Sequence, residues 1–466
     1  MPVPVLRREV RATLALAAPI VGVQLAQMSM GFVDVVMVGR LGTEALAAAV
    51  LGSTVFFTSV LLCIGVVLAV QPTVAQAVGA GDTQAVGRAT RQGLWLGTLL
   101  GVPLTIALGY AEPVLLWTGQ APETAALAAA YLGAIRWGIL PDLWFTALRG
   151  LCEGVGRPRA ILAVTLAGAV ANVGLNSVFM YGRLGVPAMG VVGTGWASAI
   201  VIAGMFVGLS LVVARGRRFR DYRIFQTLRR PDWVTLGALF RLGWPIGIGL
   251  GLEAGLFTAA TLLVGRLGPT ALAAHQVALN AASVAFMIPL GIGMAGGVRV
   301  GQATGAADAA GAARAGWTAI GLGAAFMTGS ALLFWLRPSW VVWIYAGRDP
   351  DPEVAALAVT LLGVAAVFQL FDGTQAAAGG ALRGLKDTRA PMLIGAVAYW
   401  GVGLTAGWWF GLRLGWGAPG LWWGLTLGLA VASVLLTARF QRLIGGYGTR
   451  VPLQQDPRAP DAPGPP

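Results

Sequence analysis

The sequence is poor in charged residues, cysteine and histidine, and each shortage excludes a class of protein. Only 11% of its 466 residues are charged, whereas about one quarter are charged in a soluble domain. The two cysteines, Cys63 and Cys152, both fall in apolar segments, so neither a disulfide framework nor a zinc site is indicated. With a single histidine, His275, and no nucleophile constellation, we expect neither an enzyme nor a cofactor.

Apolar residues and glycine are abundant instead. Hydrophobic residues make up 57% of the chain, and the mean hydropathy is +0.75. Apolar runs of about 20 residues without strand-like alternation predict membrane-spanning helices rather than a β-barrel. The 68 glycines suit close packing of helices in lipid. We therefore predict an all-α integral membrane protein.

Twelve spans are predicted from these apolar runs. They cover residues 12–38, 45–70, 90–110, 126–149, 160–181, 189–213, 236–263, 270–296, 315–336, 354–381, 391–412 and 418–440. Most of the 32 Lys and Arg residues fall in the breaks on the side that holds the N-terminus. Because basic residues mark the cytoplasmic side, we expect a multi-pass protein of the cytoplasmic (inner) membrane with both termini in the cytoplasm.

The net charge of +13 raises the question of a nucleic-acid partner. The arginines, however, sit in short breaks between apolar runs, so we expect contact with membrane lipids and no nucleic acid. The segment 215–233 is rich in arginine with interspersed aromatic residues, which predicts a cytoplasmic basic linker lying on anionic headgroups.

The chain contains an internal repeat. Pro245–Gln276 matches Pro19–Val50 without gaps at an offset of 226 residues, and the match includes Val38–Gly42 against Val264–Gly268. With six spans in each half, both halves enter the membrane in the same direction. This predicts two six-helix bundles related by a pseudo-two-fold axis along the membrane normal. We expect an N-lobe at 1–214, the linker at 215–233, a C-lobe at 234–445 and a disordered cytoplasmic tail at 446–466.

Three carboxylates inside the spans are the main functional candidates. Glu253 lies near the middle of its span, where an acid costs about 2.5 kcal/mol or more unless it faces a cavity or a partner. Asp34 lies on the equivalent face of the first span, because its repeat position is seven residues from Glu253 and seven residues are close to two helical turns. Gln27 stands where the repeat has Glu253 and lies in line with Asp34.

Asp372, in the tenth span, is expected to face Glu253 across a cavity of the second half. Two carboxylates at close range in a low dielectric cannot both stay ionised without a cation or proton between them. We therefore predict an ion or proton site at Glu253 and Asp372, with Asp34 as a third functional candidate. The alternative is that each acid is protonated and packed.

Other polar residues within the spans have two interpretations each. Asn172 and Asn176 lie on one helical face and either hold helices together or hydrogen-bond to Asp34. His275 is either a proton relay or a hydrogen-bonded residue of structural importance, and we favour the second. Asp142 and Arg136 also lie within a span, and their roles stay open.

Several motifs together resemble the multidrug and toxic compound extrusion family, and its NorM branch in particular. They include the run from Asp34 to Gly42, Gln71–Gln76, Asn172–Asn176, Glu253, Ala274–Asn280 and Arg299–Gln302. The resemblance covers the chain up to about residue 445. It implies an antiporter, monomeric by our expectation, that exports small organic and often cationic compounds in exchange for Na⁺ or H⁺.

The same resemblance implies roles for individual residues. Acids placed like Glu253 and Asp372 bind the coupling cation, one placed like Asp34 takes up a proton, and glutamines placed like Gln27 and Gln276 line the substrate cavity. His275, Asn280 and Phe368 are counted with this lining. Phe368 departs from the family, because a tyrosine is expected one turn before the acid of span ten, which leaves Na⁺ and H⁺ coupling both open.

An alternative within the same superfamily is a flippase for lipid-linked oligosaccharides. It would need more basic residues in its central cavity to bind phosphates, and Arg136 is the only candidate that we identify for such a position. A passive channel fits less well, because a twofold repeat with unequal acids suits alternating access.

Overall fold

The computed structural model describes residues 3–226, 231–347 and 350–450. Its first half contains the helices α1 (Val3–Gly39), α2 (Thr43–Val67), α3 (Val70–Gly79), α4 (Thr83–Ala107), α5 (Ala111–Trp117), α6 (Pro122–Ile135), α7 (Ile139–Gly154), α8 (Arg159–Tyr181) and α9 (Gly190–Arg215). The short 3-10 turns η1 (Leu108–Tyr110) and η2 (Arg136–Gly138) connect some of them.

The linker and the second half are also helical. They contain η3 (Arg217–Tyr222), α10 (Trp233–Gly265), α11 (Pro269–Gly305), α12 (Ala309–Leu336), α13 (Pro338–Ala346), α14 (Pro352–Gly384), α15 (Arg389–Gly395), η4 (Ala396–Leu404), α16 (Thr405–Trp408), η5 (Trp409–Arg413) and α17 (Gly417–Arg450). η4 and η5 are stretches of π-helix. The prediction of an all-helical, multi-span membrane protein is confirmed.

Eleven helical segments of the described chain are long and apolar enough to cross a membrane. The prediction of twelve continuous spans differs at 126–149, which falls on α6, η2 and α7. Helical backbone continues through the 3-10 turn at Arg136–Gly138, as it does through η1 within the counted segment Thr83–Trp117. The polar residues Arg136 and Asp142, rather than a break, make this path less apolar than the others. The predicted tail is also shorter than expected, since 446–450 continues α17 and the rest lies outside the described residues.

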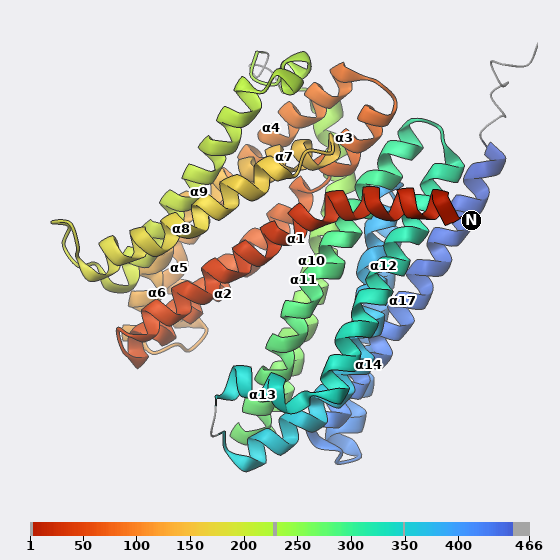
Figure 1. The fold of residues 1–466 in the computed structure, drawn as a ribbon. Helices are drawn as coiled ribbons and strands as arrows, with labels where there is room; N and C mark the ends of the chain where they lie inside the picture. Colours follow the sequence, from red (N-terminus) through yellow and green to blue (C-terminus); the bar gives the residue numbers. More distant parts are fainter. Residues whose placement is uncertain (1–2, 227–230, 348–349, 451–466) are drawn as a thin grey trace, which may run out of the picture.

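The helices form two groups that diverge from one end of the molecule to the other (Figure 1). The N-terminal bundle contains α1–α9 and the C-terminal bundle contains α10–α17. α1 contains Pro19 and bends in Figure 1, so that its first part lies against the C-terminal bundle. Ala17 and Ile20 of this part pack with Ile292 and Ala295 of α11 in one apolar cluster.

Repeat-related residues make reciprocal contacts where the bundles meet. A side chain added at Gly65 of α2 would meet the backbone of Gly247 in α10, and one added at Gly291 of α11 would meet Val21 in α1. Both pairs are related by the offset of 226 residues. Glycine at positions 65, 247 and 291 therefore lets the helix backbones approach closely.

Two amides complete this pattern. Gln76 Nε2 donates to the carbonyl oxygen of Gly384 at 2.8 Å, and Gln302 Nε2 donates to that of Gly154 at 2.9 Å. Each bond joins one bundle to the last residue of a helix in the other, Gly384 of α14 or Gly154 of α7. The interface between the bundles is thus hydrogen-bonded as well as packed at this end.

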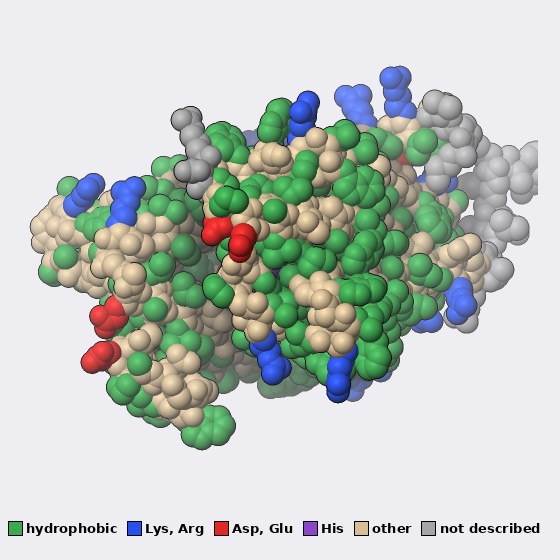
Figure 2. Space-filling view, turned by 90° about the horizontal axis from the view of Figure 1, so that it is seen from below, with side chains coloured by type: hydrophobic (Ala, Val, Ile, Leu, Met, Phe, Trp, Pro, Cys, Tyr) green, Lys and Arg blue, Asp and Glu red, His purple; other side chains and the backbone are tan. Residues whose placement is uncertain are grey.

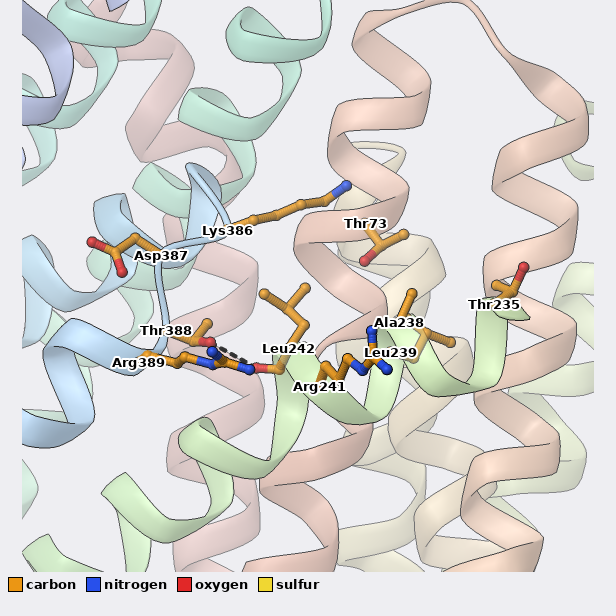
Figure 3. A pocket seen from close by; sticks show the side chains of 10 residues that line it. All are labelled: Thr73, Thr235, Ala238, Leu239, Arg241, Leu242, Lys386, Asp387, Thr388 and Arg389. Carbon is orange, nitrogen blue, oxygen red and sulfur yellow. Dashed lines mark hydrogen bonds between the residues drawn. The ribbon is translucent and has the colours of Figure 1, made fainter. Parts of the chain in front are cut away.

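The linker packs on the N-terminal bundle rather than standing free. Phe219 of η3 is buried in the apolar core of that bundle, and Arg91 Nη1 of α4 donates to the carbonyl oxygen of Arg223 at 3.2 Å. On the other side of the interface, the loop after α14 is tied to α10, because the Thr388 hydroxyl donates to the carbonyl oxygen of Leu242 at 2.9 Å (Figure 3).

Hydrophobic side chains cover much of the face shown in Figure 2, and most charged side chains there lie near its edges. Large exposed apolar residues occur on both bundles, including Phe32, Phe57, Leu262 and Val434. A surface of this kind is stable in lipid and costly in water.

Candidate functional site

The structure places Asp34 of α1 among polar side chains of α8 and α9. Asn176 Nδ2 donates to Asp34 Oδ1 at 2.6 Å, and Ser198 Oγ donates to Oδ2 at 3.3 Å. Asn172, one turn before Asn176, is buried and interacts with the same carboxylate. The predicted hydrogen bond to Asp34 is present at Asn176, whereas Ser198 was missed, because nothing in the sequence connects α9 to this position.

A cavity of about 310 Å³ opens beside Asp34 between α1, α2, α6 and α9. Its polar lining comes from Asp34, Ser53, Thr54, Tyr131 and Thr194. The Asp34 carboxylate is therefore oriented by donors on one side and reaches open space on the other.

Glu253 of α10 and Asp372 of α14 are joined through a residue that the sequence reasoning missed. Gln375 Nε2 donates to Glu253 Oε1 at 3.2 Å and to Asp372 Oδ1 at 3.3 Å. The Tyr399 hydroxyl donates to Gln375 Oε1 at 2.8 Å. The two acids thus share one amide nitrogen, which confirms that they lie close together and shows that an amide stands between them.

The sequence contained partial evidence that Gln375 and Tyr399 belong to this site. Gln375 follows Asp372 by three residues, which places both side chains on one face of a helix. Tyr399 lies in the π-helical stretch η4, and such stretches are frequent at functional sites, but its direction depends on tertiary packing. A cavity of about 170 Å³ adjoins this cluster and is lined by Glu253, Gln375, Arg383 and Tyr399 among others.

Phe368 lies one turn before Asp372 on α14 but is not among the residues that line the cavity beside Glu253. Its side chain is 1% exposed and its ring packs edge-on against Phe257 and Trp422. The hydroxyl near the acids comes from Tyr399 on a different helical segment.

His275 is buried and hydrogen-bonded at both ring nitrogens. Trp422 Nε1 donates to His275 Nδ1 at 3.1 Å, and Thr261 Oγ1 lies 3.0 Å from Nε2. Because an indole N–H only donates, Nδ1 must accept, and Nε2 then carries the proton. This arrangement holds a neutral tautomer and agrees with the structural interpretation of His275.

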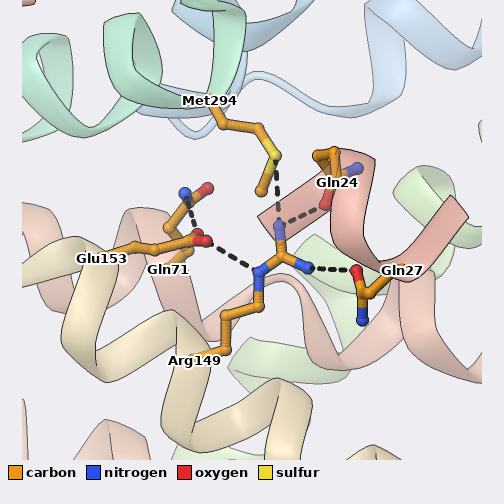
Figure 4. Close-up of polar contacts among 6 residues, drawn as sticks. All are labelled: Gln24, Gln27, Gln71, Arg149, Glu153 and Met294. Carbon is orange, nitrogen blue, oxygen red and sulfur yellow. Dashed lines mark hydrogen bonds and ion pairs between the residues drawn. The ribbon is translucent and has the colours of Figure 1, made fainter. Parts of the chain in front are cut away.

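Gln27 does not pair with Asp34. Its Oε1 accepts a bond of 3.3 Å from Arg149 Nη1, in a cluster that joins α1, α3, α7 and α11 (Figure 4). Arg149 also donates to Gln24 Oε1 at 2.7 Å and to Glu153 Oε1 at 2.7 Å. The alignment of Gln27 with Asp34 on one helical face does not decide which neighbouring helix each residue meets, and the predicted role of Gln27 in lining a substrate cavity stays a prediction.

Arg149 and Glu153 of α7 are both buried, with 9% and 1% of their surfaces exposed. Gln71 Nε2 adds a bond of 2.6 Å to Glu153 Oε2, and Arg149 Nη2 lies 3.7 Å from Met294 Sδ in the other bundle. Their i,i+4 spacing was the available signal. Arg149 is thus a buried basic residue that an ion pair with Glu153 neutralises.

Gln276 and Asn280 of α11 stay outside both acidic clusters. Gln276 is partly buried and Asn280 is exposed. Among the described residues, neither side chain forms a hydrogen bond. Their predicted role in lining a substrate cavity stays a prediction.

Two helical bundles that meet at one end, each with an acid cluster inside the membrane-spanning region, define a multi-span membrane transporter. The chain belongs to the MatE family, whose model matches residues 19–178 and 245–409. It is therefore a transporter and not an enzyme.

Curated relatives are similar over nearly the whole chain. The probable multidrug resistance protein NorM of Mesorhizobium japonicum is 41% identical over 440 residues, which are 94% of each protein. The multidrug resistance protein NorM of Burkholderia vietnamiensis is 43% identical over 442 residues, which are 94% of this chain and 95% of the relative.

Solved structures share the fold at lower identity. The outward-facing conformation of a multidrug resistance MATE family transporter superposes with a TM-score of 0.86 at 20% identity, over 95% of this chain and 97% of that one. A eukaryotic MATE transporter gives a TM-score of 0.85 at 20% identity, over 96% and 99%.

Proposed function

We propose that this protein is a multidrug efflux antiporter that exports small organic cations in exchange for Na⁺ or H⁺. It lies in the cytoplasmic membrane with both termini in the cytoplasm. The observation that carries the proposal is the amide-bridged pair of acids, Glu253 and Asp372, inside a helical bundle. The names of the NorM relatives support the substrate class.

The two lobes are residues 1–214 and 234–445, related by a pseudo-two-fold axis along the membrane normal, with the path α6–η2–α7 counted as the twelfth span. The reciprocal contacts of Gln76 and Gln302 support this symmetry. With the termini in the cytoplasm, the interface between the bundles closes the cytoplasmic side and the bundles diverge outward. Transport then requires the bundles to part at the interface and meet at the other end.

The side-chain amide of Gln375 lies between Glu253 and Asp372, at the position where we expect the coupling cation to bind. Its NH₂ group carries partial positive charge and bonds to both acids, as a bound cation or proton would. When Na⁺ enters, the amide must turn so that its oxygen faces the ion, and the Tyr399 hydroxyl can then accept from Nε2, because a phenol both donates and accepts. For H⁺, one acid takes the proton and keeps the other ionised.

Asp34 offers a second negative site, held by Asn176 and Ser198. The adjoining cavity of about 310 Å³ gives room for part of a small organic cation. Coupling follows if cargo and coupling cation compete for the negative charge of the two bundles, since each then lowers the affinity for the other.

The test is ethidium efflux from vesicles that contain the purified protein, with Na⁺ and H⁺ gradients imposed separately. Glu253→Gln is expected to abolish gradient-driven efflux with unchanged expression, and the exposed carboxylate variant Glu112→Gln is expected to match the wild type. Full efflux by Glu253→Gln under both gradients would refute the assignment.

A further inference from the structure

A third pocket lies where the loop after α14 approaches α3 and the start of α10 (Figure 3). It shares Thr388 with the cavity beside Glu253, but neither Glu253 nor Asp372 lines it. It has a volume of about 360 Å³. Its apolar lining comes from Ala238, Leu239 and Leu242 of α10, and its hydroxyl groups come from Thr73, Thr235 and Thr388. Because Thr73 belongs to the N-terminal bundle, the pocket lies between the two bundles.

Three cations line this pocket: Arg241, Lys386 and Arg389. Within the described part of the chain, none of their side chains forms a hydrogen bond, ion pair or cation–π contact. Asp387 also lines the pocket, but its carboxylate points away from it in Figure 3 and accepts from Arg439 Nε at 2.8 Å. The pocket therefore holds positive charge that the described chain does not neutralise.

Lys386 adopts a backbone conformation that a lysine does not favour. Its φ is 59°, in the left-handed region, where a side chain costs on the order of 1 kcal/mol relative to glycine. Its counterpart in the first half is Gly156, which has a φ of 78°. A lysine where the repeat has the unstrained residue indicates that its charge is useful at this place, and Figure 3 shows it extended towards the helix of Thr73.

The repeat also shows what is missing between the bundles here. In the pseudo-symmetric position, Arg299 Nη2 of α11 donates to Glu9 Oε1 of α1 at 2.7 Å, an ion pair that crosses the interface. At the offset of 226 residues, Arg299 corresponds to Thr73 and Glu9 to Thr235. One crossing is thus closed by a carboxylate of the chain, whereas the other presents free cations and two hydroxyl groups.

We propose that this pocket binds the phosphate of an anionic phospholipid headgroup, which contacts both bundles in this arrangement. Arg241, Lys386 and Arg389 supply the charge, and Thr73 on α3 supplies the contact with the other bundle. The source is a lipid because apolar α10 residues line the pocket and because Trp233, at the start of α10, is 69% exposed, as is typical at the level of headgroups. The assignment is independent of what the protein transports.

The experiment measures lipid retention by the purified full-length chain with native mass spectrometry. The protein is titrated with phosphatidylglycerol and, separately, with phosphatidylcholine of the same acyl chains. Each cation near an anionic lipid contributes about fivefold to binding. The triple variant R241Q/K386Q/R389Q is therefore expected to bind its tightest phosphatidylglycerol on the order of 100-fold more weakly than the wild type.

The matched control is R40Q/R183Q/R266Q, which removes the same charge from exposed positions just after α1, α8 and α10 and is expected to bind like the wild type. Lys386→Gly removes one cation and relieves the strained backbone, so it folds at least as well and is expected to bind about fivefold more weakly. Unchanged binding by Lys386→Gly and the triple variant, or equal binding of the two lipids by the wild type, would overturn the proposal. Displacement of phosphatidylglycerol by millimolar inorganic phosphate would overturn the lipid as the source.

Discussion

The hydroxyl of Tyr399 donates to the amide oxygen of Gln375 at 2.8 Å, and this contact turns the amide nitrogen towards the two acids of the C-terminal bundle. The bond is shorter than either bond from Gln375 to an acid, at 3.2 and 3.3 Å. Tyr399 therefore decides which end of the amide faces Glu253 and Asp372.

Replacing Tyr399 by Phe is expected to weaken coupling without removing the acids. The hydroxyl bond is worth about 1 kcal/mol, so the cation concentration for half-maximal efflux is expected to change by about fivefold, with the maximal rate largely kept. The measurement is efflux from vesicles as a function of external Na⁺ or H⁺.

Tyr110→Phe is the control, because Tyr110 is 71% exposed and far from the acids in the sequence. An identical half-maximal concentration for wild type and Tyr399→Phe would show that the phenol does not orient the amide.

Removing Arg149 is expected to destabilise the protein strongly. Glu153, 1% exposed, would keep a buried charge without its ion pair, which costs about 3–5 kcal/mol. The loss should lie near the lower value because Arg383 also interacts with Glu153. Thermal unfolding of Arg149→Met in detergent measures the effect.

A double variant separates the pair from the packing. Arg149→Met with Glu153→Gln removes both charges and keeps a side chain that can bond to Gln71, so it is expected to recover much of the lost stability. Arg183→Met, at an exposed position, should unfold like the wild type. A double variant no more stable than Arg149→Met would show that packing, not the unpaired charge, is responsible.

Gly65→Ala is expected to separate the bundles at their interface. An added Cβ at Gly65 meets the backbone of Gly247, which has no side chain to move aside, and overpacking of this kind costs about 1–3 kcal/mol. Alanine normally stabilises a helix by about 1 kcal/mol relative to glycine. The expected loss of stability in Gly65→Ala is therefore opposite in sign to the change that helix propensity alone predicts. Thermal unfolding and the distance between spin labels on α2 and α10 measure both effects.

Gly237→Ala is the matched control on α10, because no atom lies within 4 Å of a Cβ added there. It is expected to be neutral or slightly stabilising. Equal stability of the two alanine variants would mean that the helices at Gly65 are not in close contact.

Much of the fold follows from the sequence because apolar runs and their breaks set the helix ends. The fourth predicted span departs from this pattern, because the helix tightens to a 3-10 turn at Arg136–Gly138. The apolar run does not show that turn, because Pro141 permits a local change in the helix without determining where it falls.

The candidate site was predictable where residues lie on one helix and not where partners come from different helices. Asn172 and Asn176 share a face, and one of them bonds to Asp34 as expected. Gln27 shares a face with Asp34 but meets Arg149 instead. Rotation of neighbouring helices decides such contacts, and spacing along one helix carries no information on it.

His275 provides a prediction that distinguishes a structural residue from a proton relay. Its neutral ring accepts from Trp422 and donates towards Thr261. A glutamine can make the same two contacts through its amide oxygen and nitrogen, but it does not carry a proton between them. His275→Gln is therefore expected to keep the rate of efflux and its pH profile.

His275→Leu is the complementary variant, because it removes the hydrogen bonds that His275→Gln preserves. It leaves the Trp422 N–H buried without an acceptor, which costs about 1–3 kcal/mol, so its thermal unfolding temperature should fall while efflux per folded molecule keeps the wild-type pH profile. A shifted pH profile in both variants, with unfolding unchanged in His275→Gln, would instead assign proton transfer to His275. Because the glutamine variant preserves the hydrogen bonds, such a shift would have no structural explanation.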